Sequence, residues 1–281
     1  MIKLIISDYD DTLTHGEEVP ERIKDAIKKF RTLGGKFAMC TGRTCKDTKR
    51  VLDKNEMEVD AVASYVGSHV EVDDKVIWES GVPADIAFKL AREVKEKFNR
   101  ITMLFFGDTI YSNGMNDYVE NYFKWSACNG KYAEDTTEFE KQEKGFSGKI
   151  FFVKEQDDKD EDFAKIVDYV HDKFGKYVIT FDLVRVVEAI SSQATKYQAA
   201  KKIAEHFGVK EDEVITMGDA IFDQPLLKFG TGVLVKGGSG ENTIKDTAKF
   251  FAPSVENMPV AIVLESIMDG TFPKGLEKIE K

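Results

Sequence analysis

Apolar residues along this chain alternate between short continuous runs and runs with helical spacing. Residues 2–7, 37–40 and 61–65 form continuous runs, which are typical of strands buried on both faces of a sheet. After Pro20 the apolar positions recur at helical spacing, and a further helix is expected over residues 46–54. This alternation of strand and helix predicts an α/β fold with a parallel, doubly wound sheet resembling the Rossmann arrangement.

The middle of the chain has a different pattern. Apolar stripes between Ile86 and Phe98 and between Phe163 and Phe174 predict two amphipathic helices. Residues 129–144 are polar and charged, and we expect a loop there. Strands are expected at residues 101–106, 149–153, 177–181 and 185–189. The segment 80–189 is therefore predicted to form a separate α+β unit.

The first pattern returns after residue 191, with buried strands expected at 214–217 and 231–235 and a closing helix at 260–267. We therefore predict a core made of residues 1–79 and 190–281, with an α/β cap domain at 80–189 inserted between its two parts. The glycine-rich segment 236–240 lacks a Walker pattern and is interpreted as a loop that follows a strand.

Composition narrows the class of partner. The 281 residues include 40 Lys and Arg against 50 Asp and Glu, a formal net charge of −10, which argues against nucleic acid or an anionic membrane as a partner. No stretch approaches the roughly 20 apolar residues of a membrane span, and the N-terminal segment lacks the features of a signal peptide. The 3 cysteines show no C-x-x-C pair. We expect a soluble, cytoplasmic protein whose oligomeric state the sequence does not indicate.

Acidic residues follow the first expected strand directly, in the segment Asp8-Tyr9-Asp10-Asp11-Thr12. Ligand sites in open parallel sheets lie beyond the carboxyl ends of the strands. Two carboxylates at i and i+2 could hold a divalent cation there, or could attack phosphorus and exchange a proton with the leaving group. The alternative interpretation is a solvated acidic turn.

Two further candidates are weak on their own. Thr41-Gly42-Arg43 ends the next strand and opens a helix, where backbone amides and a hydroxyl can bind a phosphate, although Thr and Gly are also common helix-start residues. Lys196 begins the next expected helix and could neutralise a phosphate and orient a nucleophile, although a single Lys on a helix is usually solvated.

A second acidic pair strengthens the case for a site. Asp219 and Asp223 lie four residues apart after the strand at 214–217. With Asp8 and Asp10 they would form an oxygen-rich pocket, which suits Mg²⁺ better than zinc. We expect these four aspartates to converge around one cation at a single edge of the sheet.

The ordered set of motifs DYDDT, the Thr of CTGR, Lys196 and GDAIFD resembles the haloacid dehalogenase (HAD) superfamily over nearly the whole chain. The cap between Thr41 and Lys196, and the segment ATKYQAAKKIAEHFGVKEDEVITMGD, resemble the Cof-like (subfamily IIB) sugar phosphatases, which have a C2-type cap. The resemblance implies a Mg²⁺-dependent phosphatase for a small phosphorylated metabolite such as a sugar phosphate.

The resemblance also implies roles for individual residues. Asp8 would be the nucleophile that forms an aspartyl-phosphate, and Asp10 would protonate the leaving alcohol and then activate water. Thr41 and Lys196 would bind the phosphoryl group, with Gly42 and Arg43 beside them as substrate-binding residues. The set predicted to hold Mg²⁺ comprises the Asp8 carboxylate, the Asp10 backbone carbonyl and Asp219, with Asp223 supporting the metal or Lys196. Nearby cations would offset the repulsion between a carboxylate and a phosphate dianion.

The chain departs from the family pattern at four positions, namely Asp11, Val66, Tyr197 and Phe222. Asp11 adds a negative charge near the site, and Phe222 stands where the family commonly has Asn. None of the four removes a predicted nucleophile, metal ligand or motif Lys, so we expect activity to be retained. Two alternatives stay open, a phosphotransferase or phosphomutase on the same scaffold and a non-catalytic ligand-binding protein.

Overall fold

The computed structural model describes residues 1–155 and 158–280 of the chain. These residues form two compact units. Unit 1 comprises residues 1–42, 48–78 and 195–281, and unit 2 comprises residues 43–47 and 79–194. Residues 43–47, 79 and 190–194, which the domain prediction placed with the core, are grouped with unit 2.

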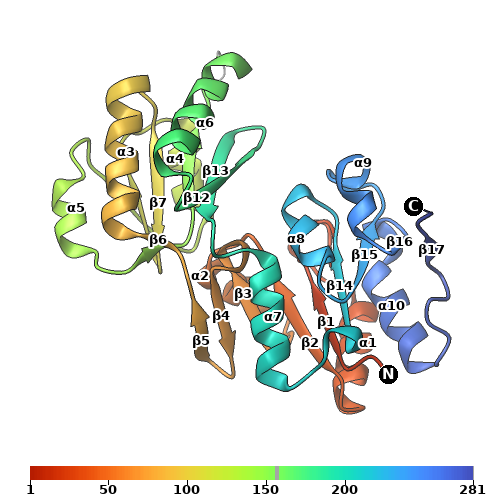
Figure 1. Ribbon diagram of the computed structural model, residues 1–281. Coiled ribbons are helices and arrows are strands. Elements are labelled where there is room, and N and C mark those ends of the chain that lie inside the picture. Colours follow the sequence, from red (N-terminus) through yellow and green to blue (C-terminus); the bar gives the residue numbers. More distant parts are fainter. Residues whose placement is uncertain (156–157, 281) are drawn as a thin grey trace. The chain divides into compact units, whose positions relative to one another are not determined.

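Unit 1 is built on a nine-stranded sheet with the order β17-β16-β15-β14-β1-β2-β3-β4-β5 (Figure 1). The central strands run parallel from β16 to β3, and antiparallel strands flank them at both edges. The strands are β1 (Leu4–Ser7), β2 (Lys36–Cys40), β3 (Ala61–Ser64), β4 (His69–Val72), β5 (Lys75–Glu79), β14 (Val214–Gly218), β15 (Thr231–Val235), β16 (Phe250–Ala252) and β17 (Glu277–Lys278). The predicted parallel sheet is confirmed.

Helices cover both faces of this sheet because successive strand residues point to opposite sides. Ile5 and its same-face neighbours pack with α1 and α10, whereas Leu4 and Ile6 pack with α7 and α8. The helices of this part of the chain are α1 (Glu21–Thr32), α2 (Cys45–Lys54), α7 (Lys196–Phe207), α8 (Gln224–Leu227), α9 (Glu241–Ile244) and α10 (Pro259–Met268). This two-sided packing explains why β1 reads as a continuous apolar run, and it confirms the doubly wound fold class.

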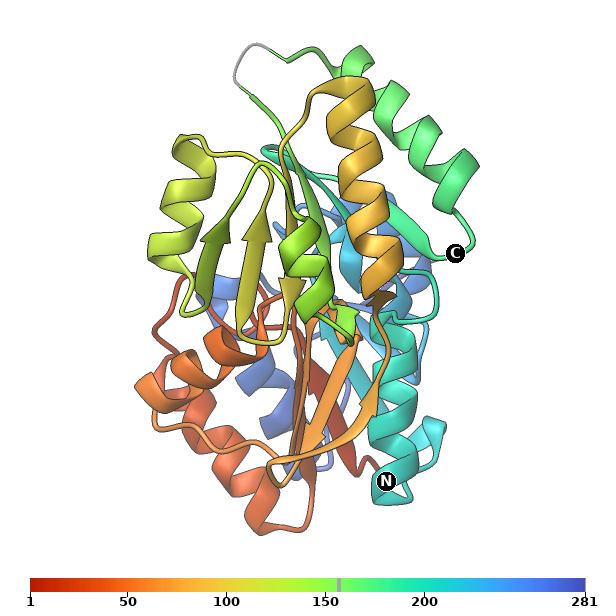
Figure 2. The same cartoon turned by 90° about the vertical axis from the view of Figure 1, so that its left-hand side faces the viewer.

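Unit 2 contains a six-stranded sheet with the order β12-β13-β11-β7-β8-β9 and a small β6–β10 pair. Its helices α3 and α6 lie side by side on one face, over Leu104, Phe152 and Val187 (Figure 2). The strands are β6 (Val82–Pro83), β7 (Thr102–Phe106), β8 (Thr109–Ser112), β9 (Asn129–Tyr132), β10 (Phe146–Ser147), β11 (Ile150–Val153), β12 (Val178–Asp182) and β13 (Val186–Ser191). The helices are α3 (Ala84–Phe98), α4 (Asp117–Trp125), α5 (Thr137–Gln142) and α6 (Asp160–Phe174).

One expectation for unit 2 was wrong. The segment 129–144, expected to be a loop, contains strand β9 and helix α5. All four residues of β9 are exposed, and α5 has no buried residue, so neither element leaves an apolar period in the sequence. β9 is held instead by backbone pairing with β8, and such pairing leaves no pattern of apolar side chains in the sequence.

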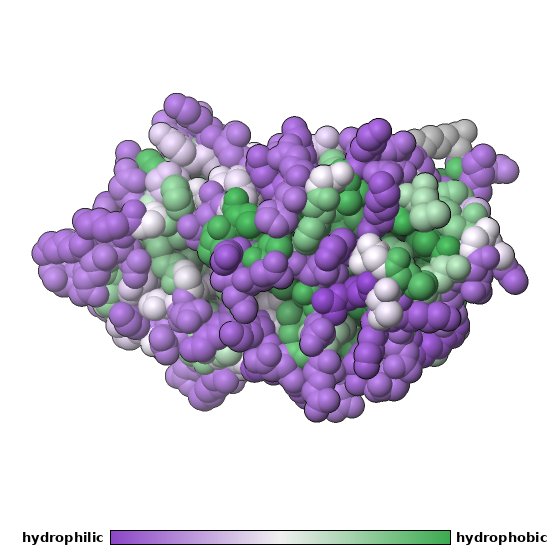
Figure 3. Space-filling view, turned by 90° about the horizontal axis from the view of Figure 1, so that it is seen from below, coloured by the Kyte–Doolittle hydropathy of each residue, from purple (hydrophilic) through white to green (hydrophobic). Residues whose placement is uncertain are grey.

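The surface agrees with the composition. Figure 3 shows mostly hydrophilic residues on one face of the molecule, with hydrophobic residues in smaller patches between them. Among the helices of the described residues, none has the length and apolar character needed to cross a lipid bilayer.

Candidate active site

The first predicted motif lies directly at the carboxyl end of β1. The Asp8 amide donates to the Met217 carbonyl at 3.0 Å, which continues the pairing of β1 with β14 by one residue. Asp8 is therefore held rigidly, and its side chain is buried. The chain then turns sharply, and Asp11 takes a positive φ of 56°, a conformation that Asp tolerates better than most residues.

Lys196 joins Asp8 to Asp223. Its Nζ lies 2.5 Å from Asp8 Oδ1 and 2.6 Å from Asp223 Oδ1, and all three side chains are buried. Lys196 is the first residue of α7, and the Thr195 hydroxyl caps this helix by accepting from the Gln198 amide. The alternative of a solvated Lys is thus excluded for Lys196.

Asp219 and Asp223 both follow β14, but they have different partners. Asp219 Oδ1 accepts a hydrogen bond from the Thr12 hydroxyl at 3.0 Å. Asp223 Oδ2 accepts from the backbone amides of Asp219 and Ala220, both at 3.0 Å, while its other oxygen binds Lys196. Both oxygens of Asp223 therefore hold protein groups in place.

Three of the four expected carboxylates converge. One oxygen from each of Asp8, Asp219 and Asp223 lies within 4.8 Å of the other two, so the three could hold a metal ion. Asp10 is exposed, and its side chain does not belong to this group of ligand atoms. An exposed carboxylate is accessible to solvent or to a bound molecule for proton exchange.

The electrostatics of this cluster favour an additional cation. Burial raises the pKa of Asp8 well above its usual value, and the neighbouring Asp223 and Asp219 carboxylates raise it further, against the opposing effect of Lys196. Burial and Asp223 also raise the pKa of Asp219 to about 7. Burial alone would lower the pKa of Lys196, but Asp223 and Asp8 raise it instead, so this ammonium stays charged. Three buried carboxylates around a single ammonium leave an excess of negative charge that a divalent cation would offset.

The chemistry of the donors also fits Mg²⁺. The cluster offers only carboxylate oxygens and nearby backbone carbonyls, which are the ligands that a hard cation of this kind prefers. The site thus matches the predicted cofactor in both charge and ligand type.

The Thr41-Gly42-Arg43 motif is divided between the two units. Thr41 is fully buried and follows β2, which pairs in parallel with β1, so its backbone lies at the same sheet edge as Asp8. Gly42 follows it in unit 1, whereas Arg43 belongs to unit 2. There the Arg43 guanidinium forms an ion pair with Asp47 at 3.0 Å.

Two contacts that shape the acidic cluster could not be predicted from the sequence. A Cβ on Gly238 would lie 2.4 Å from the Asp219 Cβ, so this position in the expected loop must be glycine for the loop to pack against Asp219. Thr12 stood in the first motif, but its bond to Asp219 spans 207 positions. A hydroxyl and a glycine carry no pairing information in a single sequence, so only the fold shows these contacts.

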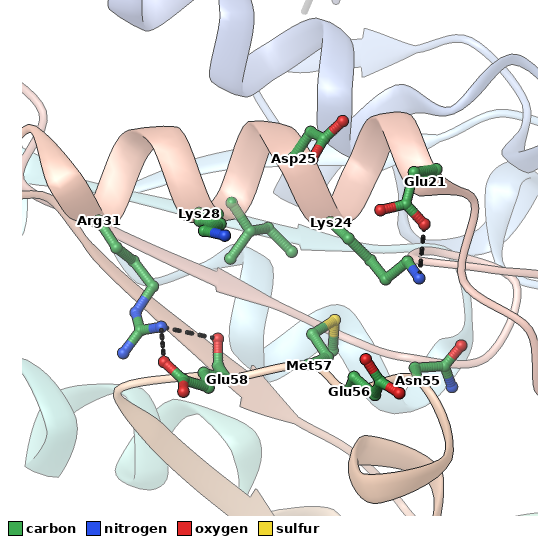
Figure 4. A pocket seen from close by; sticks show the side chains of 10 residues that line it. Glu21, Lys24, Asp25, Lys28, Arg31, Asn55, Glu56, Met57 and Glu58 are labelled. Carbon is green, nitrogen blue, oxygen red and sulfur yellow. Dashed lines mark hydrogen bonds and ion pairs between the residues drawn. The ribbon is translucent and has the colours of Figure 1, made fainter.

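A pocket elsewhere in unit 1 does not contain the predicted site residues. It has a volume of about 290 Å³ and lies between α1 and residues 55–58 (Figure 4). Its charged residues are partly paired with each other, since Lys24 contacts Glu21 and Arg31 contacts Glu58. The pocket therefore offers mixed charge rather than a concentration of one sign, and we assign it no role.

Comparison with known proteins identifies the family. The sequence model of the haloacid dehalogenase-like hydrolase family matches residues 5–264 of this chain. The chain belongs to this family. The match confirms the resemblance drawn from the motifs and the prediction of an enzyme of the HAD phosphatase type.

Individual relatives and solved structures agree with the family. The chain is 24% identical over 277 residues to 5-amino-6-(5-phospho-D-ribitylamino)uracil phosphatase YitU of Bacillus subtilis, covering 93% of this chain and 96% of that one. The structure of the HAD phosphatase BT1666 from Bacteroides thetaiotaomicron matches with a TM-score of 0.77 and 21% identity, over 97% of this chain and 96% of that one. The structure of the HAD subclass IIB sugar phosphatase BT4131 matches with a TM-score of 0.75 and 17% identity, over 96% of this chain and all (100%) of that one. These structures share the fold of this HAD-like hydrolase.

Proposed function

We propose that this HAD-like hydrolase is a Mg²⁺-dependent phosphatase that cleaves a small phosphate monoester, a sugar phosphate, through an aspartyl-phosphate intermediate. The observation that carries the proposal is the buried cluster of Asp8, Asp219 and Asp223 around Lys196. These residues come from three separate segments, and the raised pKa values of Asp8 and Asp219 mark a site that is costly to build without a function.

In the proposed reaction a carboxylate oxygen of Asp8 attacks the phosphorus atom of the ester. The bond between phosphorus and the alcohol oxygen breaks, and Asp10 donates a proton to that oxygen. The Asp10 carboxylate then takes a proton from water, whose oxygen attacks the phosphorus of the aspartyl-phosphate. Inorganic phosphate leaves, and Asp8 regains its carboxylate. The exposure of Asp10 supports its role, because this side chain must reach the leaving alcohol and water.

Lys196 and Thr41 would bind the phosphoryl group. The Lys196 ammonium already contacts Asp8 at 2.5 Å, so it could offset the charge of both the nucleophile and the phosphate. The buried Thr41 would donate its hydroxyl, with Gly42 and Arg43 as further substrate-binding residues.

Asp8, the Asp10 carbonyl and Asp219 would hold Mg²⁺. A bound Mg²⁺ would polarise the phosphoryl oxygens and reduce the repulsion between Asp8 and the phosphate dianion. The contacts of Asp223 favour the second of its two proposed tasks, because its oxygens already bind Lys196 and two backbone amides. We therefore propose that Asp223 orients Lys196 and the Asp219 turn rather than ligating the metal directly.

The proposed substrate class has separate support. YitU is named for a substrate that carries a phosphorylated ribityl group, and BT4131 is described as a sugar phosphatase. Both names refer to phosphate on a polyhydroxylated carbon chain, which agrees with the sugar phosphate expected from the sequence.

The test is a release assay for inorganic phosphate with a panel of sugar, sugar-alcohol and nucleoside monophosphates, each with Mg²⁺ or with EDTA. We expect release from at least one sugar or sugar-alcohol phosphate, and loss of release with EDTA. Release that persists in EDTA would contradict the metal role, and an absence of release from the whole panel would contradict the proposed activity. Transfer of phosphate to a second sugar instead of water would identify a phosphotransferase.

A further inference from the structure

The turn at Tyr65–Gly67, which follows β3, has an unusual backbone. Tyr65 and Val66 have positive φ values of 52° and 58°, and Gly67 follows with a φ of 98°. A β-branched residue such as Val is strongly disfavoured in this left-handed region. Tyr65 and Val66 are nevertheless buried, at 3% and 2% exposure, so the surrounding structure must hold the turn in this conformation.

One side of the turn holds Thr41. The Val66 amide donates to the Thr41 carbonyl at 2.9 Å, and the Thr41 amide donates to the Ala63 carbonyl at 2.8 Å. Both backbone polar groups of Thr41 are therefore fixed by β3 and by the turn that follows it. The Val66 side chain also lies beside Gly42, at 3.9 Å from the position of an added Cβ there.

The other side of the turn touches the start of α7. A Cβ on Gly67 would lie 2.8 Å from the Thr195 carbonyl oxygen and 3.0 Å from the Lys196 amide nitrogen. Both are backbone atoms, and the Thr195 carbonyl already accepts from the Ala199 amide in the first turn of the helix. An added methyl group would therefore have to displace either the turn or the residue that carries the Lys196 ammonium.

The turn is also closed internally. The Ser68 amide and hydroxyl both donate to the Tyr65 carbonyl, at 3.2 and 3.1 Å. The turn is thus a small closed unit packed between Thr41 and the beginning of α7, and a shift on one side would be transmitted to the other.

We propose that the Tyr65–Gly67 turn is a positioning element that sets the separation of Thr41 and Lys196 and thereby the affinity of the site for a phosphoryl group. This inference rests on the proposed function, because it assigns Thr41 and Lys196 to phosphate. It adds that a strained turn, in which Val66 departs from the family pattern, sets how well these two residues bind phosphate together. Asp8 and Asp219 belong to other strand ends, so the turn should affect phosphate binding without affecting the metal requirement.

The test compares Gly67→Ala with Gly208→Ala by calorimetric titration of inorganic phosphate in the presence of Mg²⁺. Gly208 lies at the other end of α7 and also has a positive φ, of 65°, but an added Cβ there meets no heavy atom of the described residues within 4 Å. Both variants bear the cost of Ala in a left-handed conformation, and only Gly67→Ala displaces the turn. We expect the Kd for phosphate to rise by about tenfold or more in Gly67→Ala and to stay within about twofold in Gly208→Ala.

A second measurement separates positioning from general damage. The Mg²⁺ concentration that gives half of the maximal Mg²⁺ effect on phosphate binding should stay within about twofold of the wild-type value in both variants. The reason is that the acidic cluster is left in place. Equal losses of phosphate affinity in the two variants, or an unchanged Kd in Gly67→Ala, would overturn the proposal. So would a parallel loss of Mg²⁺ affinity in Gly67→Ala.

Val66→Gly provides the second variant if Gly67→Ala does not fold. It adds no atoms and removes the strained side chain, so the turn keeps its space but loses its rigidity. The Kd for phosphate should rise by about threefold, whereas an unchanged Kd would contradict the proposal. Phosphate binding does not require turnover. A wild-type protein that binds phosphate but hydrolyses no ester would therefore refute the proposed function while the role of the turn is still tested.

Discussion

Unit 1 buries three carboxylates beside one ammonium at the end of a parallel sheet, whereas unit 2 buries Lys149 and Glu188 on a sheet rich in aromatic rings. The Lys149 Nζ lies 5.0 and 4.5 Å from the ring centroids of Phe105 and Phe151. A cation over aromatic faces is stabilised by the rings themselves. A cluster of like charges is not stabilised in this way, and it needs another cation.

The difference shows where burial of charge has a chemical consequence. Burial and neighbouring acids raise the pKa of Asp8 and Asp219 in unit 1, so a bound cation would stabilise the ionised forms of these carboxylates. In unit 2 the perturbed groups near Lys149 are tyrosines, and burial raises the pKa of Tyr118 to about 12. Tyr118 therefore stays neutral at physiological pH, and its hydroxyl remains a hydrogen-bond donor. Unit 1 thus gathers buried acids that a cation would offset, whereas the neighbours of Lys149 in unit 2 include aromatic rings and a neutral tyrosine.

The largest effect on activity is expected from Asp8→Asn in unit 1. Because Asn cannot form the aspartyl-phosphate, phosphate release should fall by a factor on the order of 10³ or more. The measurement is kcat on the best ester of the panel, with Asp53→Asn, an exposed position in α2, as the control. Similar residual hydrolysis in Asp8→Asn and the wild type would show that Asp8 is not the nucleophile.

Lys196→Met should give the largest loss of stability. The change leaves Asp8 and Asp223 buried without their ammonium partner, so the free energy of unfolding at pH 8 should fall by about 3–5 kcal/mol. Urea unfolding measures this, and Lys202→Met on the exposed side of α7 serves as the matched control. A loss no greater than that of the control would mean that Lys196 does not compensate the buried acids.

A smaller effect should appear when pH and Mg²⁺ are varied together. The pKa of Asp219 is about 7 in the folded, metal-free protein and near 3.8 when unfolded, so between these values the folded state retains a proton that the unfolded state loses. Raising the pH through this window therefore lowers the stability of the metal-free protein. Mg²⁺ binds the deprotonated carboxylates, so the rise in Tm that it causes should grow from pH 5.5 to pH 8, by a few degrees. A Tm shift independent of pH would contradict the assignment of Asp219 as a ligand.

The smallest effect is expected in unit 2, from Lys141→Met. Lys141 pairs with Glu138 on α5, but both side chains are largely exposed, so water and salt screen the interaction. Tm and kcat should both match those of the wild type. A clear fall in Tm would show that this exposed ion pair stabilises unit 2 more than solvent screening allows.

The sequence predicted the elements of unit 1 better than those of unit 2. The strand β1 and the helix α1 have strong apolar periods because both are packed against a two-sided sheet core. In unit 2 the strand β9 is exposed throughout, and α4 buries only Val119. These elements are held by backbone pairing and by aromatic contacts such as that of Tyr122 with Phe105, which have no fixed period along the chain.

The sequence alone predicted the convergence of Asp8, Asp219 and Asp223, because parallel strands bring their carboxyl ends to one sheet edge, but it also placed the Asp10 side chain in this group, where the structure does not. Only the tertiary structure decided how these groups divide their tasks. In the folded chain the two Asp223 oxygens bind Lys196 and backbone amides. Val66 lies in a left-handed turn, and its amide donates to the Thr41 carbonyl. Strand order follows from local patterns, whereas individual hydrogen bonds and strained turns depend on atoms far apart in the chain.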